Sequence, residues 1–291
     1  MLEIKDLCFA YPHKKMIIQG LTLTIEPGFT FLIGENGSGK TTLLKLIAGI
    51  LPSLPGSIML NEFDCGTEKY KEDLAYLPQE FKVYPGLKTK EILGFVAELR
   101  GIKRKLVQRE IDTVSTKTNI TEYLTTKFKH CSGGIQRRIG IACTMIGDQE
   151  LVLLDEPTVG IDPKERTKLY ETLKTCFAGK TVIISTHILD DIEVLADKIL
   201  MLDRGGISYY GTYNNFKNSL QGKLYTTSLP LETITKDTSI KVLSSSTNDL
   251  RTVYRVFSAN ELPSNDYEHV IATNDDIWTY FQSKDGDSTD G

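Results

Sequence analysis

A glycine-rich segment at residues 34–41 has residue types and spacing that suit phosphate binding. Its sequence, GENGSGKT, fits the pattern G-x-x-x-x-G-K-[ST], with an apolar run before it and a helical pattern after it. Glycines let several backbone N–H groups turn inward, and the following helix N-terminus favours anions. We predict that Lys40 reaches the β and γ phosphates of a nucleotide and that the Thr41 hydroxyl ligates Mg²⁺. The residues predicted to bind the nucleotide here are Gly34, Asn36, Gly37, Ser38, Gly39, Lys40, Thr41 and Thr42.

Two adjacent carboxylates, Asp155 and Glu156, follow the apolar run LVLL. Such a run predicts a buried strand, and open α/β sheets bind ligands at the carboxyl ends of their strands. We therefore predict that Asp155 holds Mg²⁺ through water and that Glu156, as general base, polarises the water that attacks the γ phosphate. An acidic pair after a strand is often only a solvated turn, but the phosphate loop upstream favours the catalytic interpretation.

Ser132, Gly133 and Gly134 stand at the head of another predicted helix, in the stretch HCSGGIQRR. A hydroxyl and bare backbone N–H groups at a helix start make an anion site. The flanking residues are interpreted structurally. Cys131 is expected to be a small buried hydrophobe, and Ile135 begins an apolar stripe along the helix. The arginines that follow, Arg137 and Arg138, are expected to solvate the opposite face, where one of them could contact a neighbouring subunit.

The elements that must position these groups follow from apolar periodicity. Residues 1–11 and 21–28 alternate apolar and polar side chains, which predicts antiparallel sheet at the N-terminus. The run FTFLIG predicts a strand entering the glycine-rich loop, with a helix after it that ends at Gly49. Residues 87–119 are lysine-rich and helical. Further strands in ELVLLDEP and KTVIISTH, with a helix near residues 164–176 between them, indicate buried parallel strands.

These elements predict an α/β fold with a P-loop NTPase core, a parallel sheet, an N-terminal antiparallel β-subdomain and an inserted helical subdomain over about residues 86–145. The main domain is predicted to span residues 1–215. A small α+β accessory domain is predicted over residues 220–283, because two strand-like runs, SIKVLSSS and RTVYRVFSA, precede the short amphipathic pattern DDIWTYFQ. Residues 284–291 are predicted to be a disordered tail.

The composition excludes several classes of protein. Hydrophobic residues make up 40% of the chain and charged residues 25%, and the net charge of −4 lacks the positive excess of a dedicated nucleic-acid binder. The five scattered cysteines form no C-x-x-C pair, so they predict neither a disulfide framework nor a zinc site and fit a reducing cytoplasm. The charged N-terminus and strand-length apolar runs predict no signal peptide and no membrane span.

Together these sites resemble the nucleotide-binding subunits of the ATP-binding cassette (ABC) superfamily. The resemblance covers about residues 1–213, with seven motifs in the family's order. Gln79 matches the Q-loop glutamine, which in the family senses Mg²⁺ and the attacking water. Asp162 matches the D-loop, which couples two ATP sites across a dimer. His187 matches the switch histidine that contacts the γ phosphate, and Tyr11 matches the aromatic residue that stacks on adenine.

Each of these four residues also has an ordinary structural interpretation. Taken alone, Gln79 would be a surface residue, His187 a turn residue at a strand end, and Tyr11 a core or edge-strand residue. Asp162 would cap the helix that begins at Pro163, and both roles can hold together. The shared order of the motifs favours the functional interpretation.

The resemblance also implies how the chain works. Ser132-Gly133-Gly134 matches the signature motif, which in the family faces the γ phosphate bound by the other subunit, so two chains sandwich two ATP molecules. Because the signature and Glu156 are both present, a homodimer is favoured. The wording SGGIQRR is similar to the SGGMKRR of small-molecule and peptide exporters. This implies an ATP-hydrolysing subunit on the cytoplasmic face of the membrane, which energises a separately encoded integral membrane permease and binds no nucleic acid.

Two alternatives stay open at this stage. A soluble ABC ATPase of DNA maintenance carries a long coiled coil between Q-loop and signature, whereas only residues 80–130 separate Gln79 from Cys131, and one of translation carries two cassettes. A phosphate-loop kinase or GTPase would leave the signature and His187 unexplained. The sequence does not name the transported substrate, and it assigns no role to the C-terminal extension.

Overall fold

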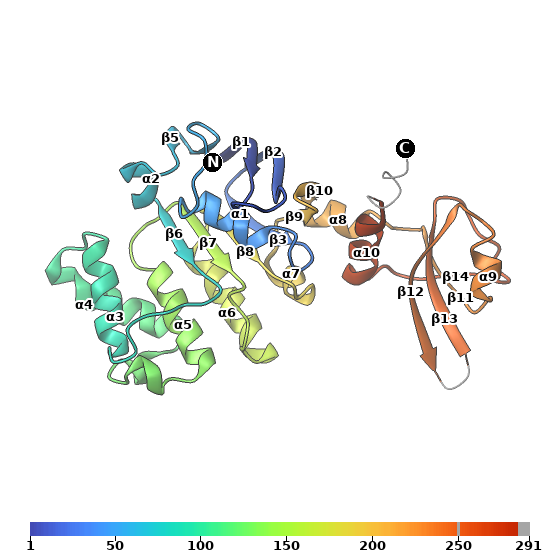
Figure 1. Cartoon of the computed structure of the whole chain (residues 1–291). Helices are drawn as coiled ribbons and strands as arrows, with labels where there is room; N and C mark the ends of the chain where they lie inside the picture. The colour runs from blue at the N-terminus through green and yellow to red at the C-terminus, as the bar shows by residue number, and fades with distance from the viewer. Residues whose placement is uncertain (249–250, 285–291) are drawn as a thin grey trace. The chain divides into compact units, whose positions relative to one another are not determined.

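The computed structural model describes residues 1–248 and 251–284 (Figure 1). The chain forms two compact units, Met1–Ile207 and Ser208–Gly291. The first unit contains the phosphate loop, the carboxylate pair and every other predicted site residue.

The centre of the first unit is a sheet of parallel strands (Figure 1). They run in the order β9-β3-β8-β7-β6. Their bounds are Gly28–Ile33 for β3, Leu74–Leu77 for β6, Leu151–Asp155 for β7, Thr181–Ser185 for β8 and Lys198–Asp203 for β9. Strands β7 and β8 consist entirely of buried residues, as expected where both faces of a sheet are covered. Because the strands are parallel, their carboxyl ends share one edge, and this edge receives the loops that carry the predicted site residues.

Helices follow the strands of this sheet in the predicted βαβ rhythm. Helix α1 (Lys40–Ile47) begins directly after the glycine-rich loop, and Gly49 lies just beyond its end with a left-handed φ of 67°. Helix α6 (Pro163–Cys176) follows β7, and helix α7 (Asp190–Leu195) follows β8. A short helix, α2 (Glu68–Glu72), precedes β6. The predicted parallel sheet with its intervening helices is confirmed.

A second, antiparallel sheet is formed near the N-terminus, as predicted. Its strands run in the order β2-β1-β4-β5. Their bounds are Leu2–Phe9 for β1, Ile18–Ile25 for β2, Ile58–Leu60 for β4 and Phe63–Asp64 for β5. Apolar residues of β2 such as Leu21, Leu23 and Ile25 are buried while the residues between them are exposed, because only one face of this sheet packs against the core.

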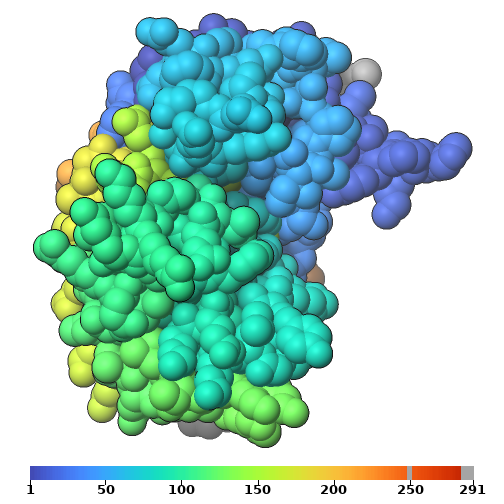
Figure 2. Space-filling model, turned by 90° about the vertical axis from the view of Figure 1, so that its left-hand side faces the viewer, coloured from blue at the N-terminus to red at the C-terminus, as the bar shows by residue number. Residues whose placement is uncertain are grey.

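The inserted helical region has its own apolar core. It contains α3 (Thr89–Leu99), α4 (Arg104–Lys117), the 3₁₀ turns η1 (Thr121–Tyr123) and η2 (Phe128–His130), and α5 (Gly133–Thr144). Figure 2 views the side of the molecule that carries this region, in blue-green and green. The buried core residues are Ile92, Leu93, Ala97, Ile111, Val114, Ile120, Phe128, Cys131, Ile139, Ala142, Cys143 and Ile146.

The second unit contains another antiparallel sheet, in the order β12-β13-β11-β14. The strands are β11 (Leu224–Thr227), β12 (Ile240–Asn248), β13 (Arg251–Ser258) and β14 (Glu268–His269), and the helices are α8 (Tyr213–Asn218), α9 (Leu231–Ile234) and α10 (Asn274–Lys284). Strands β12 and β13 and helix α10 lie where the sequence predicted two strands and a helix. The short elements β11, β14 and α9 were not predicted.

The junction between the units falls after Ile207, and strand β10 (Gly206–Thr212) lies across it. The sequence placed the end of the main domain at residue 215 and the accessory domain at residues 220–283, and these limits remain predictions. Of the predicted disordered tail, residues 285–291 lie outside the described residues. No helix within the described ranges is long and apolar enough to cross a bilayer.

Candidate active site

A pocket of about 310 Å³ lies at the shared carboxyl edge of β3, β6 and β7. It is lined by Ile17, Asn36, Gly37, Gly39, Lys40, Thr41, Thr42, Gln79 and Glu156. All of these except Ile17 were predicted site residues. Three segments that are far apart in the sequence therefore meet where the topology of a parallel sheet places ligands. Ile17 was missed because an isolated apolar residue in the loop before β2 carries no chemical motif.

The phosphate loop adopts a backbone that requires glycine. Gly37 and Gly39 have φ angles of 89° and 106°, and a Cβ atom on Gly34 would lie 2.4 Å from the Ser38 Oγ atom. Lys40 Nζ donates hydrogen bonds to the carbonyl oxygens of Gly34 (2.6 Å) and Glu35 (2.9 Å). Burial lowers the pKa of Lys40, and the nearby carboxylates, Glu156 foremost, oppose that shift. A buried ammonium beside a cradle of this kind suits a phosphate group.

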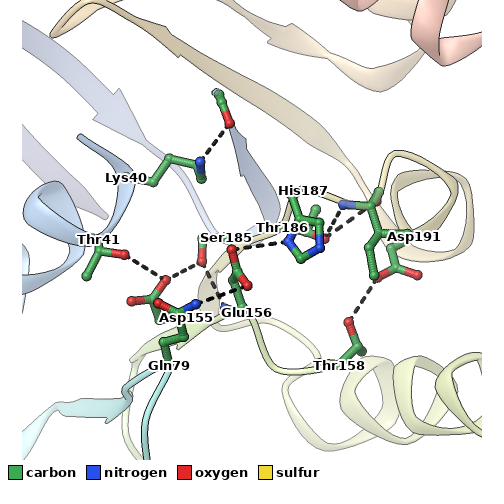
Figure 3. Close-up of polar contacts among 12 residues, drawn as sticks. Lys40, Thr41, Gln79, Asp155, Glu156, Thr158, Ser185, Thr186, His187 and Asp191 are labelled. Atoms are coloured by element: carbon green, nitrogen blue, oxygen red, sulfur yellow. Dashed lines mark hydrogen bonds and ion pairs between the residues drawn. The ribbon is translucent and has the colours of Figure 1, made fainter. Parts of the chain in front are cut away.

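Asp155, the last residue of β7, combines paired and unpaired oxygens. Its Oδ1 atom accepts hydrogen bonds from Ser185 Oγ at 2.5 Å and from Thr41 Oγ1 at 3.4 Å (Figure 3). Its Oδ2 atom is buried and has no hydrogen-bond partner within the described part of the chain. A buried carboxylate oxygen normally has a partner, so this orphan fits the water shell of a cation held between Thr41 and Asp155. Residues of the described ranges offer no cluster of three His, Cys, Asp or Glu side chains that could hold a metal ion.

Glu156 lies between two other predicted site residues. Its Oε2 atom accepts a hydrogen bond of 3.4 Å from Gln79 Nε2, and its Oε1 atom lies 3.2 Å from His187 Nδ1 (Figure 3). The Glu156 backbone N–H donates to Ser185 Oγ at 2.9 Å, and its φ of 50° is left-handed. A non-glycine residue held in this conformation is strained and persists only where its surroundings fix it. The arrangement presents a carboxylate, an amide and an imidazole together beside the phosphate loop.

The Ser-Gly-Gly segment begins α5 but does not line this pocket. Ser132 is the N-cap residue, and its Oγ atom accepts a hydrogen bond of 3.4 Å from the Ile135 N–H. Ser132 and Gly133 are exposed, and a Cβ atom on Gly133 would meet nothing within 4 Å. The predicted anion site is therefore an open helix start that is separate from the phosphate loop of its own chain.

Tyr11 and Asp162 lie outside the lining of the pocket, as do Gly34, Ser38, Asp155 and His187 of the predicted set. Tyr11 makes an edge-to-face contact with Phe9, with ring centroids 5.0 Å apart. Asp162 is the N-cap of α6, where Oδ1 accepts a hydrogen bond of 3.0 Å from the Lys164 N–H. The capping interpretation of Asp162 is confirmed, while its role at a dimer interface and the adenine contact of Tyr11 stay predictions.

The expectation that Arg137 and Arg138 solvate a free helix face is wrong. Arg137 is 6% exposed and Arg138 is 9% exposed. Arg138 forms an ion pair of 2.6 Å with Glu165 of α6. Arg137 donates hydrogen bonds to the main-chain oxygens of Pro78, Gln79, Asp155 and Pro157. Apolar periodicity identifies one buried stripe of α5, but it does not reveal that the other side of the helix is covered by the loops after β6 and β7.

The two residues that flank the Ser-Gly-Gly segment have the predicted structural roles. Cys131 is buried in the core of the helical region, and burial raises the pKa of its thiol. Ile135 packs against the same core. Packing therefore explains why Cys131 and Ile135 differ from the residues that usually flank the signature motif.

A buried polar network around Asp191 was not predicted from the sequence. The carboxylate of Asp191, in α7, accepts hydrogen bonds from Thr158 Oγ1 (3.0 Å) and Tyr170 OH (2.8 Å), and it pairs with Arg166 at 3.2 Å. Thr158 follows the carboxylate pair, while Tyr170 and Arg166 belong to α6. The network therefore ties the segment after Glu156 to the helix that follows His187 (Figure 3).

Known proteins share this fold and are similar in sequence to this chain. The family profile described as ABC transporter matches residues 18–159. The linearmycin resistance ATP-binding protein LnrL of Bacillus subtilis (strain 168) is 34% identical over 226 residues, covering 76% of this chain and 72% of LnrL. The chain belongs to the ABC transporter family. A solved ATP-binding subunit of an ABC transporter matches this ABC protein with a TM-score of 0.69 and 28% identity, covering 75% of this chain and 92% of that one.

A second solved structure shares the fold of this ABC protein. It is the dimeric ATP-binding cassette MJ0796 in a post-hydrolysis state with ADP and Pi, with a TM-score of 0.66 and 21% identity, covering 73% of this chain and 98% of that one. Membership of the family makes the chain an ATP-binding subunit with ATPase activity. The predicted α/β fold, the ATP-binding function and the family resemblance are confirmed.

Proposed function

We propose that this ABC ATPase energises a separate membrane permease that exports a small molecule, drug or peptide. The observation that carries the proposal is the 34% identity with LnrL over most of both chains, because that relative is named for resistance to linearmycin. The motif SGGIQRR at residues 132–138, which is similar to that of small-molecule and peptide exporters, supports the same function. We propose that the ATPase lies on the cytoplasmic face of the cell membrane, where it would contact the permease.

The residues of the pocket suit hydrolysis of ATP. Lys40 and the loop N–H groups would hold the β and γ phosphates, and Thr41 and Asp155 would hold Mg²⁺. Mg²⁺ bound there would supply charge neutralisation for the phosphates. Glu156 would take a proton from the attacking water. The water oxygen would then bond to the γ phosphorus as the bond between this phosphorus and the ADP oxygen breaks. Gln79 and His187, each within 3.4 Å of Glu156, would orient that carboxylate and the water.

A second copy of the chain would complete each site. Ser132, Gly133 and Gly134 do not line the pocket of their own chain, yet they form an exposed helix start with the properties of an anion site. A two-fold dimer would place this helix start of one chain against the γ phosphate held by the other. The dimeric state of MJ0796, which shares the fold, supports this arrangement.

The contact with the permease is proposed at a groove beside Gln79. This groove, of about 820 Å³, is bounded by the end of β6, by α3 and by α5. Its apolar lining includes Leu77, Phe81 and Val96, and Glu80, Lys82 and Arg100 supply charge. An amphipathic helix from a permease matches such a surface. Movement of that helix would be coupled to ATP through the loop that holds Gln79.

Export can be tested in cells and membranes. We expect deletion of the gene to raise susceptibility to a membrane-active or peptide antibiotic, and re-expression of the wild-type chain to restore resistance. Re-expression of Lys40→Ala, which cannot hold the phosphates, is the matched control and should restore nothing. The chain should also co-purify with a multi-helix membrane protein. Unchanged susceptibility, together with purification free of any membrane protein, would favour a soluble ABC ATPase.

A further inference from the structure

The Arg137 guanidinium lies at the meeting point of three segments of the first unit. It extends from the second turn of α5, the helix that begins with the Ser-Gly-Gly segment. One nitrogen, Nη1, donates to the carbonyls of Pro78 (2.7 Å) and Gln79 (3.2 Å), in the loop after β6. Nη2 donates to the carbonyl of Asp155, the last residue of β7, and Nε donates to Pro157 O at 3.1 Å, in the loop that follows. The last two carbonyls stand on either side of Glu156 in the chain.

The four carbonyl acceptors around this buried side chain match the donors of an arginine. A guanidinium carries five N–H donors in a planar fork, and four acceptors from two loops are matched to it here. A lysine has three donors that spread from one point, so it cannot reach all four carbonyls. The described contacts of Arg137 are with main-chain oxygens, which is unusual for a buried cation. Burial lowers the pKa of Arg137 to about 10, and Asp155 and Glu156 oppose that shift, so the side chain stays charged at neutral pH.

The geometry of Glu156 depends on the two loops that Arg137 joins. The hydrogen bond from Gln79 Nε2 to Glu156 Oε2 is long, at 3.4 Å, so a small change in the spacing of the loops would break it. Glu156 also has a left-handed φ of 50°, which requires its neighbours to be held in place. Arg137 holds the carbonyls of both neighbours, Asp155 and Pro157, together with the backbone of Gln79.

We infer that Arg137 is a positioning residue for ATP hydrolysis, which fixes the spacing between the loop of Gln79 and the loop of Glu156 and anchors both to the signature helix. The inference rests on the proposed catalytic roles of Gln79 and Glu156. Arg137 does not line the phosphate-loop pocket, so it acts through these two residues and leaves the phosphate contacts unchanged.

Arg138 provides a matched control for a test of this role. It is the next residue of the same helix, it is buried to a similar extent, and its partner is the Glu165 side chain. Arg137→Gln is expected to lower kcat at least about tenfold, because misplaced catalytic groups cost one to two orders of magnitude. The Kd for MgATP should stay within about threefold of wild type. Arg137→Lys, which keeps the charge, should remain impaired, whereas Arg138→Gln should keep most of its kcat even where its melting temperature falls.

A double-mutant cycle separates positioning from general stability. If Arg137 acts through Gln79, Arg137→Gln should reduce kcat much less in a Gln79→Ala background than in the wild type. Three results would overturn the inference: wild-type kcat in Arg137→Gln, fully additive losses in the double variant, or ATP affinity and kcat falling in parallel with the melting temperature.

ATPase assays of Glu156→Gln and Arg137→Gln distinguish failure of the proposed function from failure of the role of Arg137. If Glu156→Gln retains full ATPase activity, the catalytic assignment of Glu156 fails whatever Arg137 does. If Glu156→Gln is inactive while Arg137→Gln hydrolyses ATP normally, only the positioning role of Arg137 fails.

Discussion

Ser185 Oγ donates a hydrogen bond of 2.5 Å to Asp155 Oδ1, across the parallel pair of β7 and β8, and accepts one of 2.9 Å from the Glu156 N–H. One hydroxyl at the end of β8 therefore orients both residues of the carboxylate pair. Among the residues that the structure describes, the Asp155 Oδ2 atom has no hydrogen-bond partner. The sequence offered no motif for Ser185, yet the register of the sheet places it directly opposite Asp155.

Ser185→Ala should lower the rate of ATP hydrolysis more than it lowers the affinity for ATP. The substitution removes a buried donor to Asp155 and one of the two acceptors of the Glu156 N–H, which keeps its contact with the Ser185 carbonyl oxygen at 3.2 Å. The loss costs about 1–3 kcal/mol of folding stability. We expect a lower kcat and a requirement for more Mg²⁺, with an ATP affinity near that of wild type at saturating Mg²⁺. ATPase titrations against Mg²⁺ and a thermal melt check this. An unchanged Mg²⁺ dependence would show that Ser185 does not orient Asp155 for its proposed role in binding Mg²⁺.

Glu156→Gln should nearly abolish hydrolysis while retaining ATP. The amide keeps the shape of the side chain and its contact with Gln79, but it cannot accept the proton from the attacking water. Unhydrolysed ATP should then hold two chains together, because a ligand shared by two chains stabilises their association. Gel filtration with and without ATP measures the dimer, and a phosphate-release assay measures turnover. Full ATPase activity in the variant would contradict the role of Glu156 as general base.

Gly134→Asp and Ile135→Gln should separate ligand contact from packing at adjacent positions. A Cβ atom on Gly134 would meet only Gly160 O, at 3.5 Å, so the fold accepts a side chain there. A carboxylate at this helix start would repel a phosphate, and we expect turnover to stop without a large change in melting temperature. Ile135 packs against the helical core, so Ile135→Gln should cost about 1 kcal/mol of stability and leave most activity. Gly134→Ala, which adds no charge, is the control for Gly134→Asp.

The turnover and the melting temperature of both variants are measured in parallel, by ATPase assay and thermal melt. The reverse pattern, in which Gly134→Asp melts early but turns over normally and Ile135→Gln is stable but inactive, would refute the division of roles within the segment.

The part of the site that the sequence predicted is the part that local patterns determine. Glycine spacing and strand-length apolar runs place Lys40 and Glu156 at the ends of strands, and the parallel sheet then brings them together. The roles of Ser185, Asp191 and Arg137 were missed because their partners lie on other elements and no local pattern records such pairings. Arg137 was misplaced outright, because a polar residue opposite an apolar stripe is normally solvated, and only the packed loops show that this helix face is covered.

Asp276 is expected to make the stability of the second unit depend on pH in acid. Asp276, in α10, accepts hydrogen bonds from Arg255 of β13 (2.8 and 2.7 Å) and from the Thr273 N–H and Oγ1 atoms (2.8 and 2.7 Å). Burial alone would raise its pKa, but the hydrogen bonds from Arg255 and Thr273 outweigh burial and lower it. Because the pKa is lower in the folded chain than in the unfolded chain, the carboxylate stabilises the fold fully above about pH 4, the ordinary value for aspartate.

This stabilisation should be lost as the pH falls from about 4 through the lower folded-state pKa, where Asp276 takes up a proton. Asp276→Asn removes the charge at every pH, so the variant should melt at a lower temperature than wild type at pH 7, and the difference should shrink in acid. Melting curves of both full-length chains between pH 7 and pH 3 measure it, and neutral-pH ATPase activity should be unchanged because Asp276 is not part of the nucleotide pocket. A difference that stays constant as the pH falls would mean that Asp276 stabilises α10 by its hydrogen-bonding shape, with no contribution from its charge.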